Sequence, residues 1–212
     1  MNQTLDPKIQ KCIGNIEDRL LGVQNDLKAF VYVRQNNLQH STKDNIGGGS
    51  IVVALSLFTA LNFLGKTYYC IARPDKFNED GSAKNETATF VNFMKFIQRD
   101  IDLGLSTNGQ VLELVWSGFR DHLAHRLTVE PGKSIITFQF EPSHEGSISD
   151  ILERVKGRQV FGHDGNHRNW IVNGDVLLAV LPDIIAKTIE FIASSDADNV
   201  DLLLKVIGVE YP

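Results

Sequence analysis

The sequence predicts a mainly helical protein, with a four-helix bundle in residues 1–128 and a small C-terminal β/α appendage in residues 129–212 that packs on it. Three observations lead to this prediction. Apolar residues recur with a helical period through most of residues 1–128. Strand-like alternation begins only after them, at "SIITFQF". The length of 212 residues and the apolar content of 42% suit a single domain with its own core.

Two long helices are expected first. Asp6 and Pro7 begin residues 7–38, in which apolar side chains recur every three or four residues at Ile9, Ile13, Ile16, Leu20, Leu27, Phe30 and Val31. The turn-rich segment "STKDNIGGGS" then separates this helix from a very apolar second one. Ser50 is the expected N-cap of the second helix, which should end near residue 72.

Two further helices should complete the bundle. The third is marked by a wide apolar face of Phe90, Val91, Phe93, Met94, Phe96, Ile97 and Ile101. The fourth should start at "STNGQ" and stop near "EPGK". One apolar stripe is expected along it, formed by Leu112, Val115, Trp116, Phe119, Leu123 and Leu127.

The C-terminal part leaves two alternatives open. "SIITFQF" predicts a strand, and "NWIV-NG-DVLLAV" fits either a hairpin over its Asn-Gly turn or a strand followed by a helix that Asp175 caps. Pro182 then lies early in a helical stretch, or kinks it. "NVDLLLKVIG" predicts a last short helix.

Composition restricts the classes of protein to consider. The formal net charge of -5 argues against a surface that is basic throughout, so any RNA contact should be a local basic patch. Cys12 and Cys70 occupy helix core contexts, which favours a reducing compartment over a disulfide framework. The first residues lack the pattern of a signal peptide, and the apolar stretch of residues 51–64 is too short to cross a membrane. We therefore expect a cytoplasmic protein with no membrane partner.

The segment "FRDHLAHRL", residues 119–127, concentrates functional side chain types on the fourth predicted helix. At about 100° per residue, Asp121 and His125 lie nearly opposite the apolar stripe, with Arg120 at its boundary. His122 and Arg126 fall on the other flank. A histidine near a helix C-terminus suits proton transfer, and an arginine can bind a phosphate through two hydrogen bonds. The alternative is a solvated helix face that contains histidines by chance.

An arginine, a polar residue and a histidine late in a helix resemble the Arg-x(4–6)-His motif of HEPN domains, here as Arg120, Asp121 and His125. The resemblance covers residues 7–128. It implies a homodimer that pairs two motifs, and a metal-independent endoribonuclease or toxin-type RNase that needs no cofactor. By this resemblance Arg120 would bind the scissile phosphate, His125 would transfer protons and Asp121 would orient both. Other proteins of this family resemble inactive binding modules or modules associated with antitoxins.

Bare Arg…His spacing is weak by itself, because it also occurs at Arg34…His40 and Arg158…His163. Neither of these pairs lies late in a strongly periodic helix. The segment "GRQVFGHDGNHRNW" is instead a candidate binding loop, whose Arg158, His163, His167 and Arg168 could attract phosphate near Arg120 and His125. His163, Asp164 and His167 could also hold a metal ion, but loop geometry disfavours that interpretation, and we predict no metal site.

The segment "ALNFLGKT", residues 60–67, fits a relaxed phosphate-binding loop pattern, but its bulky residues continue a helix. Two functions from different classes therefore follow from the sequence. The first is an HEPN-like endoribonuclease that acts on RNA through Arg120 and His125. The alternative is a non-catalytic helical binding or scaffold module, whose exposed face binds another protein or a nucleotide.

Overall fold

A computed structural model describes these parts of the 212-residue chain: residues 5–38, 48–104, 109–117, 135–139, 150, 153–154, 158–163, 169–195 and 199–208. Within them the chain is mainly helical, with six α-helices and one small sheet. In this part of the chain no helix combines the length and the hydropathy needed to traverse a bilayer.

The first helix, α1, spans Pro7–Leu38 and confirms both predicted ends. Pro7 occupies the first helical position, where its missing N–H costs nothing, and the backbone N–H of Lys8 donates to Asp6 Oδ1 at 2.7 Å. The apolar residues of its buried stripe follow the helical period and are Ile9, Cys12, Ile16, Leu20 and Leu27. The local sequence signals were sufficient here.

The second helix, α2, spans Gly48–Ala72 and forms the centre of the core. It begins two residues before the predicted cap, so Ser50 lies inside the helix and the prediction of a cap at Ser50 is wrong. Arg73 to Ala83 form a connection that includes the short 3-10 helix η2 (Pro74–Lys76).

The third helix, α3, spans Glu86–Ile97 and is capped by Asn85, whose Oδ1 accepts the backbone N–H of Ala88 at 2.9 Å. It ends at Ile97, so Ile101, which the sequence assigned to this helix, lies beyond it. The fourth helix, α4, is described from Gly109 to Ser117 and packs on α3.

Three short strands form the sheet in the order β1-β3-β2. β1 (Ile135–Gln139) confirms the strand predicted from "SIITFQF" and pairs in parallel with β3 (Asn169–Asn173). β2 (Phe161–His163) pairs with β3 in the antiparallel sense.

The Asn-Gly dipeptide does not form a hairpin, so that alternative is wrong. β3 leads directly into α6 (Gly174–Ala193), with Asn173 at the N-cap position and Asp175 buried in the first turn. Pro182 lies inside α6, and the predicted last helix is confirmed as α7 (Val200–Ile207). Gly208 ends α7 in the left-handed conformation, with φ 66°.

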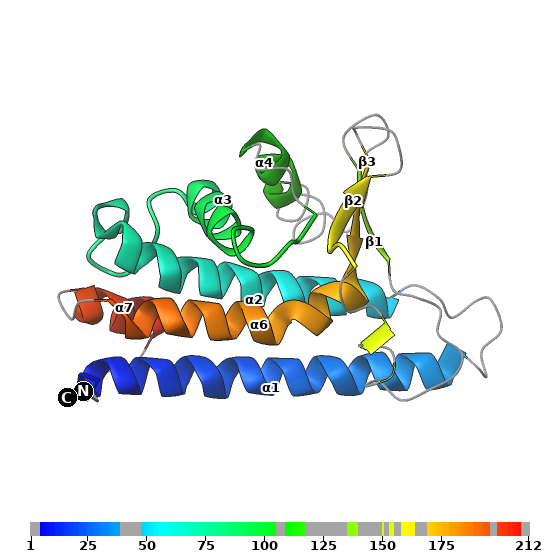
Figure 1. Cartoon of the computed structure of the whole chain (residues 1–212), viewed down its shortest axis with the longest axis horizontal. Coiled ribbons are helices and arrows are strands. Elements are labelled where there is room, and N and C mark those ends of the chain that lie inside the picture. Colours follow the sequence, from blue (N-terminus) through cyan, green and yellow to red (C-terminus); the bar gives the residue numbers. More distant parts are fainter. Residues whose placement is uncertain are drawn as a thin grey trace.

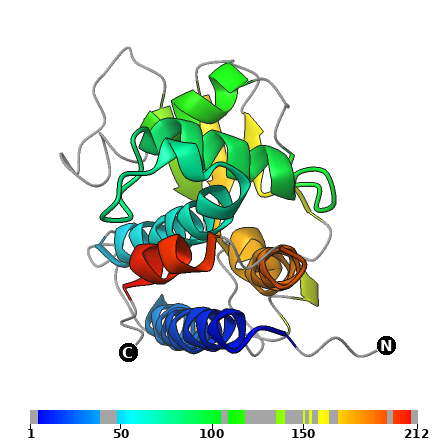
Figure 2. The ribbon, with the colours of Figure 1, turned by 90° about the vertical axis from the view of Figure 1, so that its left-hand side faces the viewer.

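The helices after residue 128 pack on the first two helices of the bundle. α6 contacts both α1 and α2, and α7 contacts the same two helices. Figures 1 and 2 show α1 on one side of the molecule and α3 with α4 on the opposite side of α2. The apolar sequence of α6 fits this central position, because a helix with apolar residues on most sides must be buried.

Candidate functional site

α4 is the helix that leads to the predicted catalytic residues. Arg120, Asp121 and His125, together with His122 and Arg126, fall in residues 118–134, outside the described residues. The structure therefore neither brings these side chains together nor separates them. It does describe the preceding nine residues of the helix, about two and a half turns, which determine the direction of each face at Ser117.

The packing of α4 agrees with the predicted stripe as far as the helix is described. Leu112, Val115 and Trp116 are buried, whereas Glu113, Leu114 and Ser117 are exposed. The indole ring of Trp116 stacks on Phe90 of α3, with ring centroids 4.8 Å apart and an interplanar angle of 26°. This contact fixes the rotation of α4 about its own axis.

Part of the predicted basic loop is held near the connection that precedes α4. Arg158 is exposed, two residues before the buried Val160. The backbone N–H of Phe161 donates to the carbonyl of Leu103 at 2.8 Å. The backbone of His163 closes β2 opposite Trp170, while His167 and Arg168 lie outside the described residues.

Two other sequence patterns can be compared with the structure. In the described part of the chain, no cluster of three or more His, Cys, Asp or Glu residues could hold a metal ion, although Asp164 and His167 lie outside it. Residues 60–67 are in the interior of α2, as the sequence predicted, and Lys66 Nζ lies 2.9 Å from Glu86 Oε1. This segment is thus helical and forms no phosphate-binding loop.

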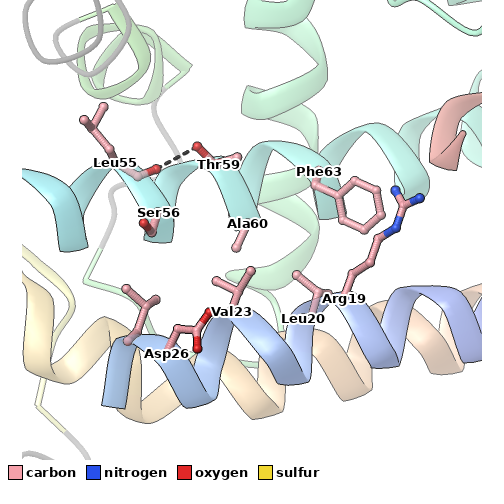
Figure 3. A pocket seen from close by; sticks show the side chains of 10 residues that line it. Arg19, Leu20, Val23, Asp26, Leu55, Ser56, Thr59, Ala60 and Phe63 are labelled. Atoms are coloured by element: carbon pink, nitrogen blue, oxygen red, sulfur yellow. Dashed lines mark hydrogen bonds between the residues drawn. The ribbon is translucent and has the colours of Figure 1, made fainter. Parts of the chain in front are cut away.

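Sequence reasoning missed a pocket of about 400 Å³ between α1 and α2 (Figure 3). Its apolar lining comes from both helices and consists of Leu20, Val23, Leu27, Leu55, Ala60 and Phe63. Four polar residues complete the lining, namely Arg19, Asp26, Ser56 and Thr59. This volume falls within the range of small-molecule sites, and it exceeds the voids of a well-packed interior.

The polar side chains of the pocket differ in their surroundings. The hydroxyl of Thr59 donates to the carbonyl of Leu55 at 2.7 Å, within its own helix. The Arg19 guanidinium carbon lies 6.0 Å from the centroid of the Phe63 ring. Asp26 follows Arg19 by seven residues on α1, both side chains are exposed, and Figure 3 shows them apart along the helix at the edge of the pocket. The two charges therefore lie at opposite ends of the pocket.

The sequence alone gave little indication of this pocket. Leu20 and Leu27 obey the same period as the other core residues of α1, and nothing local shows that α2 places a small side chain, Ala60, beside them. A pocket depends on the spacing of two helices, which is a tertiary property. The one usable signal was Arg19 next to an apolar stripe.

The chain matches no family model, no curated protein and no solved structure.

Proposed function

We propose that this chain is an HEPN-like protein that cleaves RNA without a metal ion, through Arg120 and His125, with Asp121 positioning them. The observation that carries the proposal is the one-sided burial of α4, the helix that leads into the motif. A catalytic helix of this kind must keep one face free of its own bundle, since the substrate and the second motif have to reach that face.

The exposed residues of α4 indicate which side chains share that face. Asp121 follows Leu114 by seven residues and His125 follows it by eleven, so each would deviate from its direction by about 20° on a continuous helix. Arg120 is related to the exposed Glu113 in the same way. The sequence period predicts that the helix continues far enough for this relation to hold.

The chemistry needs a base, an acid and a group that binds the phosphate. The imidazole of His125 accepts the proton of a ribose 2′-hydroxyl, whose oxygen attacks the adjacent phosphorus. The bond from phosphorus to the 5′-oxygen breaks. The imidazole of the partner subunit's His125, in its protonated form, donates a proton to that oxygen. Arg120 neutralises the charge that develops on the phosphate. The products are a 2′,3′-cyclic phosphate and a 5′-hydroxyl.

RNA would have to be attracted locally, because the chain as a whole carries a formal net charge of -5. We assign this role to Arg158, His163, His167 and Arg168, with His122 and Arg126 on the flank of the helix. Arg158 is exposed, as a phosphate-binding residue must be. This assignment predicts cleavage that weakens steeply as salt is raised.

The test is cleavage of a mixed-sequence fluorescent RNA in EDTA by wild type, Arg120→Ala and His125→Ala. Loss of a general acid or base should lower the rate by about 100-fold or more. His40→Ala is the matched control, because His40 belongs to an Arg…His pair of similar spacing outside the motif. A product ending in 2′,3′-cyclic phosphate is expected. Equal cleavage by wild type and His125→Ala would overturn the proposal.

A second candidate is a non-catalytic module that binds or scaffolds a protein through the same face of α4. Leu114 favours it, since this large apolar side chain is 39% exposed on that face. Both candidates predict that Leu114→Glu weakens association, which sedimentation would measure against Leu21→Glu on α1. Only the nuclease predicts that cleavage depends on His125, so absence of cleavage by a folded wild type favours the binding module.

A further inference from the structure

Within the described residues, the pocket between α1 and α2 continues the groove in which α7 contacts the same two helices. α7 contacts both helices, and Lys8 Nζ of α1 pairs with Asp201 Oδ1 of α7 at 2.7 Å. Arg19 and Asp26 follow Lys8 by 11 and 18 residues, which places all three within about 20° on one face of α1. Figure 3 shows the pocket along this face. Among the described residues, α7 therefore covers one part of this groove, and the residues that line the pocket form its next part.

The floor and the walls of the pocket have different exposures. Leu20, Leu27 and Ala60 form a floor that is at most 4% exposed. Val23 and Phe63 stand as partly buried walls on the two helices. Removing water from such walls is favourable in proportion to their apolar area, so an apolar body of matching width gains free energy by entering.

Among the described residues, neither charged side chain of the pocket has a counter-charge. In the described part of the chain neither Arg19 nor Asp26 makes a hydrogen bond or an ion pair, and the one contact of the Arg19 guanidinium is with the Phe63 ring. They are seven residues apart, or about 10 Å along the helix axis. A guanidinium held over a ring keeps its N–H groups available for a carboxylate or phosphate.

We propose that this pocket binds an elongated amphiphilic zwitterion, with an acid group at Arg19, an apolar chain along the floor and an amine at Asp26. The separation of the two charges sets the length of the ligand. Asp26 repels a second acid group and so fixes the orientation. The residues of the pocket differ from those assigned to RNA cleavage, so this proposal does not rest on the proposed nuclease activity.

The first probe is 8-aminooctanoate, added to the full chain while the thermal unfolding midpoint is followed. A ligand that binds only the folded state raises the midpoint in a concentration-dependent manner, here with an expected dissociation constant of about 1 mM. Octanoate and octylamine each retain only one of the two charged contacts. Because an exposed ion pair contributes little free energy, each should bind only about threefold more weakly than 8-aminooctanoate. 4-Aminobutyrate is too short to reach both charges and should give no shift.

The charge variants separate the two ends of the ligand. Arg19→Gln should weaken the binding of octanoate and leave the binding of octylamine unchanged. Asp26→Asn should weaken the binding of octylamine and leave that of octanoate unchanged. Arg99→Gln, at an exposed arginine of the connection after α3, is the matched control and should change neither. If octanoate binds as tightly as 8-aminooctanoate and Asp26→Asn changes nothing, the zwitterion proposal is wrong.

Filling the pocket tests its location. Ala60→Leu adds bulk at the floor and should lower affinity for 8-aminooctanoate at least tenfold. Leu55→Trp, on the partly exposed wall, should also lower the affinity for 8-aminooctanoate and leaves the buried floor unaltered. It replaces Ala60→Leu in the test if that variant is unfolded. Circular dichroism checks that each variant is folded. Unchanged binding in a folded filling variant, or no shift with wild type, overturns the proposal.

Discussion

Trp116 of α4 stacks on Phe90 of α3 with ring centroids 4.8 Å apart, and Phe90 in turn stacks on Phe58 of α2 at 6.1 Å. The three rings form a continuous column from the centre of the bundle to its outer helix. Trp116 is 3% exposed and is the largest side chain of α4. Trp116 therefore contributes the largest share of the buried surface by which α4 attaches to the molecule, together with the smaller Leu112 and Val115.

We expect Trp116→Ala to lower the free energy of unfolding by about 3–5 kcal/mol, because it removes both the buried area and the stacking contact. Denaturation with urea, followed by circular dichroism, measures the change. Leu114→Ala on the exposed face is the control and should cost about 0.5 kcal/mol or less. A loss below about 1 kcal/mol for Trp116→Ala would contradict the role of the ring column.

Gly104 and Gly208 allow backbone strain and crowding to be separated. Both have positive φ, 72° and 66°, but a Cβ at Gly104 would lie 2.4 Å from the carbonyl oxygen of Phe161, whereas one at Gly208 meets nothing within 4 Å. Gly208→Ala should cost about 1 kcal/mol. Gly104→Ala should cost at least about 2 kcal/mol more, since β2 would have to move. Equal losses of unfolding free energy would show that the contact with β2 is easily displaced.

The two thiols predict a loss of stability at alkaline pH. Burial raises the pKa of Cys12 from 9.0 to about 11 and that of Cys70 from 9.0 to about 12. The unfolded chain loses these protons first, so their contribution is complete below pH 9.0 and is lost as the pH rises from there toward 11 and 12. Within that window, the titration of each thiol lowers the free energy of unfolding by up to about 1.4 kcal/mol for each unit by which the pH rises.

Urea unfolding between pH 8 and pH 10 measures this dependence, and Cys12→Ala with Cys70→Ala provides the control. The double variant should have a flatter profile than wild type. A thiol reagent at pH 8 should also label the native protein far more slowly than the unfolded chain, since both cysteines are buried. Rapid labelling of the native protein would contradict the burial of the pair.

Pro182 is an exposed proline inside α6, and Pro182→Ala should stabilise the protein. The proline supplies no N–H to the carbonyl of Leu178, one turn earlier. We expect a gain of about 1 kcal/mol, less than proline costs in an unadapted helix, because α6 already accommodates the ring. Asp183→Ala, the neighbouring exposed position, is the control for helix propensity. A net loss of unfolding free energy would mean that the proline ring stabilises the native helix.

Local signals predicted the parts of the fold that depend on local physics. Asp6 and Pro7 gave the start of α1, and the period of "NVDLLLKVIG" gave α7. The Asn-Gly pair was ambiguous, because a tight turn and a helix start use the same residues. The helical alternative is the observed one, since the apolar residues after Gly174 are buried against α1 and α2. That burial depends on tertiary contacts, which the Asn-Gly dipeptide does not determine.

In the candidate sites too, features that depend on one helix were predictable from the sequence, and features that depend on tertiary contacts were not. The stripe of Leu112, Val115 and Trp116 was predictable from a single helix, and its burial agrees with the prediction. The pocket beside Arg19 was not, because it depends on how α1, α2 and α7 share one groove. Periodicity identifies which face of a helix is apolar, but not whether another element covers all of it.

The ion pair between Lys8 and Asp201 joins positions that are 193 residues apart. It marks a fold in which the first helix is completed by the last two described helices, α6 and α7. Contacts between such distant segments form slowly, because chain entropy is lost before they are gained. During synthesis α1 and α2 are made early and expose their apolar faces until the ribosome has produced α6 and α7. Aggregation of the nascent chain is therefore most favourable in that interval.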